Sequence, residues 1–246
     1  MKAFLTHLFL QFKLGLREKT LLIDFYLVPL GFYLIMGGVM SSINPMFRQT
    51  LITSMIIFAV TMGGLMGVAE PLSKLRESGT LRSYRVMGIP ARSVLLIDVL
   101  GTFLHLMLAS IIILVTAPIF FKADAPKNYI LFIAVLALYI LTTIAVGLLF
   151  GVLARPHMAT MLSTIVFVFS VMLSGMMFQT SLLPKSLMYL GRILPATYAD
   201  QGLSGLSFGL TTNIDSGAAI AVLAGICVVC GIVCGIRFIK INRESV

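Results

Sequence analysis

Two ionisable side chains lie inside a long apolar stretch of this sequence. Asp98 and His105 are separated by about two helical turns, so they project from roughly the same face of a helix. An ionisable group within a membrane span is a functional candidate by default. A single His and a single Asp do not make a catalytic set, however, and contacts between helices would explain the same two residues. The sequence leaves both interpretations open.

A second group of residues that could do chemistry is a set of three cysteines. Cys227, Cys230 and Cys234 lie within the last apolar stretch, with the spacing of part of a metal motif. No fourth ligand is near, and a helix spreads the three over more than one face, so we interpret them as small packing residues. The sequence also has no Gly-Lys-Ser or Gly-Lys-Thr of a phosphate-binding loop. We therefore expect no catalytic residue, no metal site and no cofactor bound by this chain.

The composition places these residues in a membrane protein. Of the 246 residues, 59% are apolar and 11% are charged, and the mean hydropathy is +1.06, whereas about a quarter of the residues in soluble domains are charged. A spanning helix needs roughly 20 apolar residues. Six stretches qualify, with a kink expected at Pro29 in the first of them: 21–40, 51–69, 93–121, 129–153, 158–178 and 218–239. We expect an all-α membrane protein that forms one transmembrane domain over residues 1–246.

The first 20 residues predict an amphipathic helix rather than a cleaved signal peptide. Phe4, Leu8 and Phe12 fall on one helical face, whereas Lys13 and Arg17 fall on the other. A helix of this kind lies in the membrane interface with its basic face toward the lipid headgroups.

The basic residues predict the orientation of the chain. The formal net charge is +9, and Lys and Arg concentrate in residues 1–20, 70–92 and 237–243. The positive-inside rule then places both termini in the cytoplasm. Anionic lipid headgroups explain the basic residues, and no basic-aromatic surface suited to nucleic acid is evident.

Two connecting segments are unusual. Residues 70–92 form the longest and most charged inside loop, in which Pro71 is expected to begin a helix. A short amphipathic helix in this loop would either dock into a groove on a soluble partner or be part of a solvated loop that only sets topology. Residues 179–217, on the outside, are too apolar for a free loop and too broken to span, which favours a re-entrant or interfacial helical hairpin.

Pairs of glycines four residues apart recur in the spans. Such pairs allow helices to approach closely, and packing within one bundle is the expected role. The pairs are Gly63 with Gly67, Gly147 with Gly151, and Gly231 with Gly235.

Short motifs in both connecting segments resemble one family. Residues 76–81 read Arg-Glu-x-Gly-Thr-Leu, and residues 87–90 read Met-Gly-Ile-Pro before a new span. Residues 173–178 read Leu-Ser-Gly-Met-Met-Phe, and Pro184, Leu194-Pro195 and Thr197-Tyr198 follow. The order and spacing of these motifs resemble the type-2 ATP-binding-cassette (ABC) exporter permeases over essentially the whole chain.

The resemblance implies a role for each matched segment. The residues that would couple the chain to a cytoplasmic ABC ATPase subunit are Arg76, Glu77, Gly79, Thr80, Leu81, Tyr84 and Arg85. The residues that would form an outer gate are Pro184, Leu194, Pro195 and Tyr198. Leu75 and Arg82 depart from the family pattern, because many relatives carry acids there, and this leaves the charge pattern of the docking partner open.

The function that this resemblance implies is that of a membrane-spanning permease subunit of an ABC exporter in a bacterial plasma membrane. It would move an amphipathic or hydrophobic substrate (a drug, a lipid or a peptide) with ATP–Mg held by the ATPase subunit, beside a second permease copy and membrane lipid. The alternatives are an ion-coupled secondary transporter, a membrane-embedded enzyme that relies on Asp98 or His105, and a membrane partner protein that transports nothing.

Overall fold

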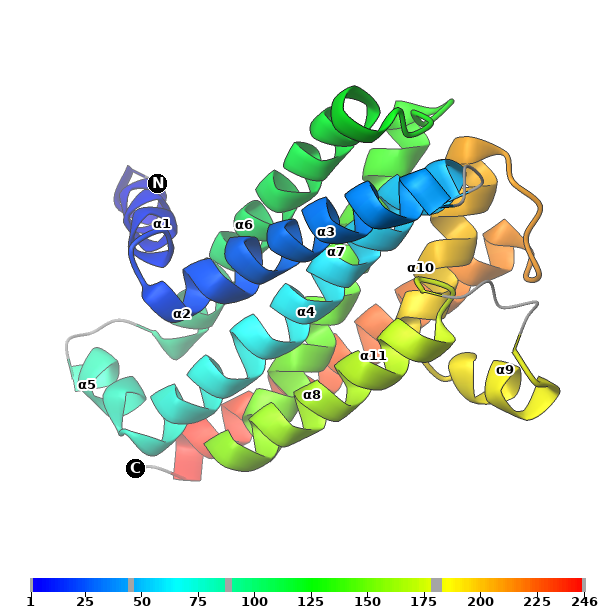
Figure 1. Cartoon of the computed structure of the whole chain (residues 1–246). Coiled ribbons are helices and arrows are strands. Elements are labelled where there is room, and N and C mark those ends of the chain that lie inside the picture. Colours follow the sequence, from blue (N-terminus) through cyan, green and yellow to red (C-terminus); the bar gives the residue numbers. More distant parts are fainter. Residues whose placement is uncertain (1, 44–46, 87–89, 178–182, 245–246) are drawn as a thin grey trace.

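The fold consists of helices of very unequal length. A computed structural model describes residues 2–43, 47–86, 90–177 and 183–244 and, within these ranges, all side chains except those of residues 2–5, 81, 82, 85, 91, 92 and 239–244. No strand occurs in these ranges. Among the described residues, six helices are long and apolar enough to cross a membrane, which confirms the predicted all-α membrane protein (Figure 1).

The six candidate spans follow the predicted order. They are α2 with α3 (Lys19–Leu22 and Val28–Ile43), α4 (Phe47–Glu77), α6 (Ala91–Phe121), α7 (Tyr129–Leu153), α8 (Pro156–Leu173) and α11 (Ser216–Glu244). The shorter helices are α1 (Lys2–Gly15), α5 (Thr80–Val86), α9 (Lys185–Gly191) and α10 (Pro195–Leu203).

The first span is irregular next to the expected proline. A π-helical turn, Ile23–Leu27, joins α2 to α3, and the amide of Val28 donates to the carbonyl of Ile23. Pro29 has no amide hydrogen to donate to the preceding turn. The wider turn therefore lies where the sequence predicted a kink.

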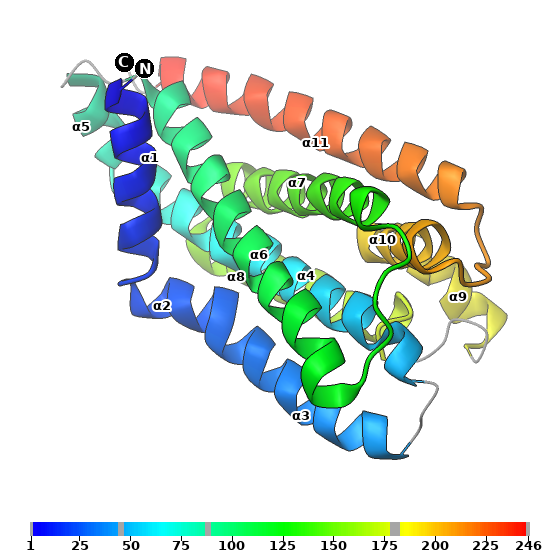
Figure 2. The same cartoon turned by 90° about the horizontal axis from the view of Figure 1, so that it is seen from above.

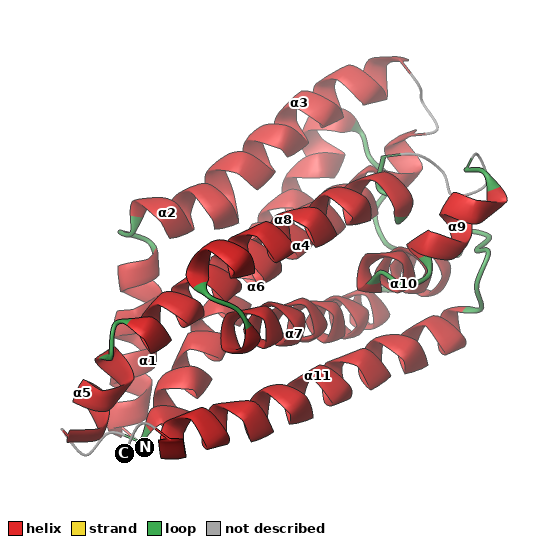
Figure 3. Cartoon of the chain, turned by 90° about the horizontal axis from the view of Figure 1, so that it is seen from below, coloured by secondary structure: helices red, strands yellow, loops and turns green. Residues whose placement is uncertain are grey.

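Helices α4 and α7 form the centre of the bundle. Helix α4 packs against α3, α6, α7, α8 and α10, and α7 packs against α4 and α11. In the most apolar 18 residues of α4, 94% of the residues are buried, whereas in the corresponding part of α11 17% are buried. Figure 3 shows α7 between α8 and α11. Helix α4 is thus enclosed by the rest of the chain, whereas α11 leaves most of its surface for lipid or another protein.

The two ends of the bundle differ. Figure 2 shows α1, α5 and the last turns of α11 at one end, which we call the α5 end, and α9 and α10 at the opposite end, which we call the α10 end. Because the described chain has six spans, its first helix and the end of its last helix lie at the same, α5 end.

Two of the predicted boundaries are wrong. Helix α4 runs on to Glu77, so the segment predicted as a loop from residue 70 is helical up to that point, and Pro71 lies inside the helix rather than at its start. Burial keeps these turns helical, because Leu72 and Ser73 are enclosed by neighbouring helices. Helix α8 ends at Leu173 instead of continuing to 178, and Gly175 follows in a left-handed conformation (φ 102°) that ends helices readily.

Helix α1 packs against α6 around His105. The ring of His105 stacks between the rings of Phe12 and Phe25, with centroid distances of 4.4 Å and 5.4 Å. Its Nδ1 lies 2.9 Å from the hydroxyl of Tyr26. A Cβ on Gly15 would lie 2.5 Å from the Nε2 of His105, so the backbone of α1 rests directly on this ring.

Candidate functional site

Helix α5 is a short helix joined to the central helix by one glycine. Gly79 has φ 71° and no atom near its missing Cβ, so its backbone conformation, not crowding, favours glycine there. Ser78 and Thr80, on either side, approach each other with hydroxyl oxygens 2.7 Å apart. The chain thus turns sharply at Gly79 between the last turn of α4 and the first turn of α5.

The side chains of α5 divide between the bundle and its surroundings. Val86 is 83% exposed, a high value for a large apolar side chain, whereas Tyr84 is half-buried against the bundle. Thr80 is half-buried and Glu77 is exposed. The side chains of Leu81 and Arg85 lie outside the described residues. The structure therefore brings the predicted coupling residues to one end of the molecule.

Arg76 is used inside the chain. Its Nη1 donates to the carbonyl oxygen of Gly151 at 2.7 Å and to that of Val152, with Ala154 O more distant at 3.4 Å. These carbonyls belong to the last turn of α7 and the residue after it, where helices leave acceptors without partners and carry partial negative charge. The sequence-based expectation gave Arg76 a polar contact to a partner; in the structure its guanidinium caps α7.

Ser73 strengthens the same attachment. Its Oγ donates to the carbonyl of Ala154 at 2.7 Å and is completely buried. A Cβ on Gly151 would lie 2.7 Å from the carbonyl oxygen of Ala69, so the two helix backbones are in close contact one turn earlier. The end of α4 that carries α5 is therefore fixed to the end of α7.

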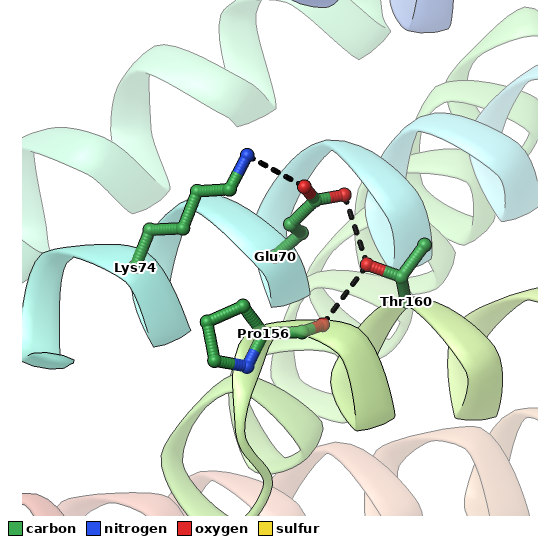
Figure 4. A network of polar contacts seen from close by, with 4 residues as sticks. All are labelled: Glu70, Lys74, Pro156 and Thr160. Carbon is green, nitrogen blue, oxygen red and sulfur yellow. Dashed lines mark hydrogen bonds and ion pairs between the residues drawn. The ribbon is translucent and has the colours of Figure 1, made fainter.

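A second polar network connects α4 to α8. Figure 4 shows Glu70 between Lys74 and Thr160, with Glu70 Oε1 2.6 Å from Lys74 Nζ and Glu70 Oε2 2.9 Å from the hydroxyl of Thr160. That hydroxyl also lies 3.0 Å from the carbonyl of Pro156, and its single hydrogen can serve only one of these acceptors at a time. Helix α4 thus contacts the end of α7 through Arg76 and the start of α8 through Glu70, on either side of the connection between them.

The predicted outer hairpin consists of two short helices. Pro184 and Leu194 immediately precede α9 and α10, and Pro195 is the first residue of α10. The hydroxyl of Tyr198 donates to the carbonyl of Arg192 at 2.7 Å, which closes the turn between the helices. At about 1.5 Å per residue neither helix could cross a membrane.

Helix α10 is embedded in the bundle. It packs against α11, α7 and α4. Its buried residues include three with polar side chains: Thr197, Asp200 and Gln201. Thr197 donates to the carbonyl of Gly191 at 2.5 Å, and Gly191 in turn lies against the end of α8. This part of the chain enters the bundle without spanning it.

Sequence analysis overlooked a buried polar chain in this region. Asp200 accepts from the amide of Gln201 at 3.1 Å, and the carbonyl oxygen of that amide accepts from the backbone N–H of Asn213 at 2.8 Å. Burial raises the pKa of Asp200 to about 7. Nearby, the hydroxyls of Tyr139 and Thr61 lie 2.5 Å apart across α7 and α4. The signal available in the sequence was an adjacent Asp and Gln in an otherwise apolar hairpin.

Asp98 and His105 contact different partners. Asp98 Oδ1 lies 3.4 Å from Nε2 of Gln11 in α1, whereas His105 contacts Tyr26 and two phenylalanine rings. His105 acts as a packing contact between helices, which is one of the two interpretations left open by the sequence.

The three cysteines are free, with Cys234 buried and Cys227 and Cys230 half-buried. Across the described ranges, no group of three or more His, Cys, Asp or Glu side chains is arranged to hold a metal ion.

One comparison with known proteins gives a match. The family described as ABC-2 family transporter protein matches residues 15–236. This range includes every helix from α2 to α10 and most of α11. No curated protein matches the chain.

Proposed function

This chain belongs to the ABC-2 transporter family, and we propose that it is the membrane-spanning subunit of an exporter driven by a separate ABC ATPase. The observation that carries the proposal is the mechanical connection at the α5 end. A short helix with an exposed apolar residue, Val86, is joined through Gly79 to the most enclosed helix of the bundle.

The attachments of α4 support a route for the motion. When ATP draws two ATPase subunits together, each would carry its docked α5 with it. The displacement would pass through Gly79 to the end of α4. Arg76 and Ser73 connect that end to α7, and Glu70 connects it to α8. One docking helix would in this way move three spans as a unit.

The proposed orientation follows from charge. Lys13 belongs to α1, Arg17 to the turn after it, Lys74 to the last turns of α4, and Arg155 to the α7–α8 connection bonded to that end of α4. These segments are at the α5 end, which agrees with a cytoplasmic α5 and cytoplasmic termini. A bacterial plasma membrane is the proposed location. The partners are the ATPase with its ATP–Mg, a second copy or a related permease, and lipid.

The proposed cargo is amphipathic or hydrophobic. Helices α3, α8 and α11 present many exposed apolar side chains, which suit lipid, a second permease or an apolar substrate. The hairpin of α9 and α10, of which α10 is buried in the bundle, would close the route on the outer side. Net export requires that the substrate binds the inward-open and outward-open states with different affinities, because otherwise ATP hydrolysis would not drive net transport of the substrate.

The test is a pull-down of the tagged chain from gently solubilised native membranes, with its partners identified by mass spectrometry. A variant with Val86→Glu and Glu77→Ala changes the exposed surface of the α5 end. Its matched control, Ile193→Glu, places the same charge on a residue that is 72% exposed at the α10 end.

We expect an ATPase with a phosphate-binding loop to copurify with the native chain and with the control, but not with the α5 variant. Copurification with all three proteins would leave the exporter in place and reject α5 as the docking site. Transport that follows the proton gradient and persists without any ATPase would reject the exporter.

A further inference from the structure

A cavity of about 190 Å³ opens at the α5 end, between α1, α2, α4, α5 and α6. An apolar cavity of roughly 150 Å³ accommodates a benzene molecule, so this one can hold a ligand of slightly larger size. Tyr84 of α5 lines it, as do Gln11 of α1 and Asp98, Thr102 and His105 of α6. The cavity lies within a single copy of the chain. Its lining includes Tyr84 but not Val86 or Glu77, the exposed residues of the proposed docking surface.

The charge of the lining is opposite to that of the protein. The formal net charge is +9, yet both charged residues among the described lining residues, Glu18 and Asp98, are acidic. Lys74 interacts electrostatically with Glu18. Its ammonium is already 2.6 Å from Glu70, and its side chain is 65% exposed, so it is not available to the cavity.

Asp98 has weak internal compensation. Among the described residues, its hydrogen-bond partner is the amide of Gln11, at 3.4 Å from Oδ1. This distance exceeds the usual range for N–H···O bonds, which is about 2.7–3.2 Å. A partly buried carboxylate gains substantially from a charged donor that can approach more closely.

The rest of the lining favours an organic cation over a metal ion. Apolar walls are supplied by Leu21, Phe25, Leu72 and Leu75, and the ring of Tyr84 lies at the same cavity. A metal ion would require several converging oxygen or nitrogen ligands, whereas aromatic rings and methylene groups suit the body of an amine.

We propose that this cavity is a binding site for a small organic ammonium ion, whose charged nitrogen pairs with Asp98 and Glu18 and whose apolar body lies against Phe25 and Leu72. The site touches α1, α4 and α5 together, so an occupant stabilises their arrangement. The proposal rests on this cavity and holds whether or not the chain is an exporter.

Two sources could supply the ammonium group: a free amine or the headgroup of an ethanolamine phospholipid. An apolar groove suited to an acyl chain also lies between α1 and α6, lined by Phe12 and Met107 among others. Phe12 stacks on His105 with centroids 4.4 Å apart, and this contact separates the groove from the cavity. The geometry thus favours a free amine that enters from the α5 end.

The experiment measures binding of phenethylamine to the purified full chain in nanodiscs of phosphatidylglycerol, by isothermal titration calorimetry. No ATPase is present, so the result is independent of transport. The neutral isostere 2-phenylethanol is titrated in parallel. We expect saturable binding of the amine and at least about tenfold weaker binding of the alcohol, because the alcohol lacks the charge that pairs with the carboxylates.

Three variants locate the site. Asp98→Asn keeps the shape of the side chain and is expected to weaken amine binding about tenfold or more. Thr102→Met fills the cavity, keeps both carboxylates and is expected to abolish binding. The control Asp124→Asn removes an exposed carboxylate outside the cavity and is expected to change nothing. If either cavity variant fails to fold, Glu18→Gln replaces it, with an expected several-fold loss.

Equal binding of the amine and the alcohol, or full affinity in Asp98→Asn and Thr102→Met, would overturn the proposal. A further arm adds phosphatidylethanolamine to the nanodiscs. Competition with phenethylamine would identify a lipid headgroup as an occupant of the same ammonium site, whereas unchanged affinity would leave the free amine.

Discussion

Replacing Arg76 by alanine should distinguish a structural role, in which Arg76 caps α7, from direct contact with the ATPase. In the structure the guanidinium caps α7 through the carbonyls of Gly151 and Val152. Each hydrogen bond to a charged group contributes roughly 1.5–3 kcal/mol. Because Arg76 is only half-buried, water can replace part of this interaction. We therefore expect Arg76→Ala to lower the free energy of unfolding by about 2 kcal/mol.

The three free cysteines in α11 provide the assay for this change. A thiol-reactive fluorophore reports unfolding on heating, because Cys234 is buried in the native chain. Arg76→Ala should react at a lower temperature than the native protein, and Arg76→Lys should fall between them, since lysine keeps the charge but loses the planar fork. The control is Arg237→Ala, which removes an exposed arginine from α11 and should leave the transition unchanged.

Binding of the ATPase distinguishes the structural role from direct contact. If Arg76 acts by fastening α4 to α7, Arg76→Ala should still copurify with the ATPase but show weaker coupling of ATP hydrolysis to transport. An unchanged melting transition together with loss of the ATPase would refute this reasoning, because it would place Arg76 at the partner surface.

Three further perturbations test other parts of the structure. Gly147→Ala should lower the free energy of unfolding by about 1–3 kcal/mol, because its Cβ would overlap the carbonyl oxygen of Gly64. Gly231 has open space around it, so Gly231→Ala should not destabilise the chain in the same thermal assay. Gly79→Ala should cost about 1–2 kcal/mol of left-handed backbone strain confined to the α4–α5 turn, and should weaken transport coupling in proteoliposomes more than it lowers the melting temperature. The native pKa of Asp200 lies above its unfolded value, so its stabilising contribution is complete below about pH 4 and is lost as the pH rises toward about 7. The melting temperature should therefore fall between about pH 4 and pH 7, and the fall should be smaller in Asp200→Asn. An equal fall in both proteins would assign it to another group.

The sequence predicted the short helix of the candidate site but not the contacts that fasten it to the bundle. A short amphipathic helix was predicted within residues 70–92, and α5 (Thr80–Val86) is that helix. It follows Gly79, whose left-handed backbone conformation glycine adopts without strain. The internal use of Arg76 could not be foreseen. Its acceptors are backbone carbonyls about 75 positions away in the chain. Every residue has a backbone carbonyl, so residue type does not indicate which ones will accept.

The spans themselves follow directly from the sequence. A backbone in lipid must satisfy its own hydrogen bonds, so a sufficiently long apolar run forms a helix wherever it occurs. The predicted boundaries of the fourth span, Tyr129–Leu153, agree with the structure. The last two turns of α4 do not follow from hydropathy, since contacts with α7 and α8 keep that charged segment helical.

The glycine pairs show most clearly where sequence information ends. Gly147 with Gly151 and Gly231 with Gly235 have the same spacing in equally apolar helices, and by sequence both pairs predict close packing. In the structure the first pair contacts the backbone of α4, whereas the second faces open space. Local sequence determined that both segments are membrane helices, because that depends only on the residues within each run. Which face of a helix meets a neighbour depends on how all six spans pack around α4, and only the tertiary structure decides it.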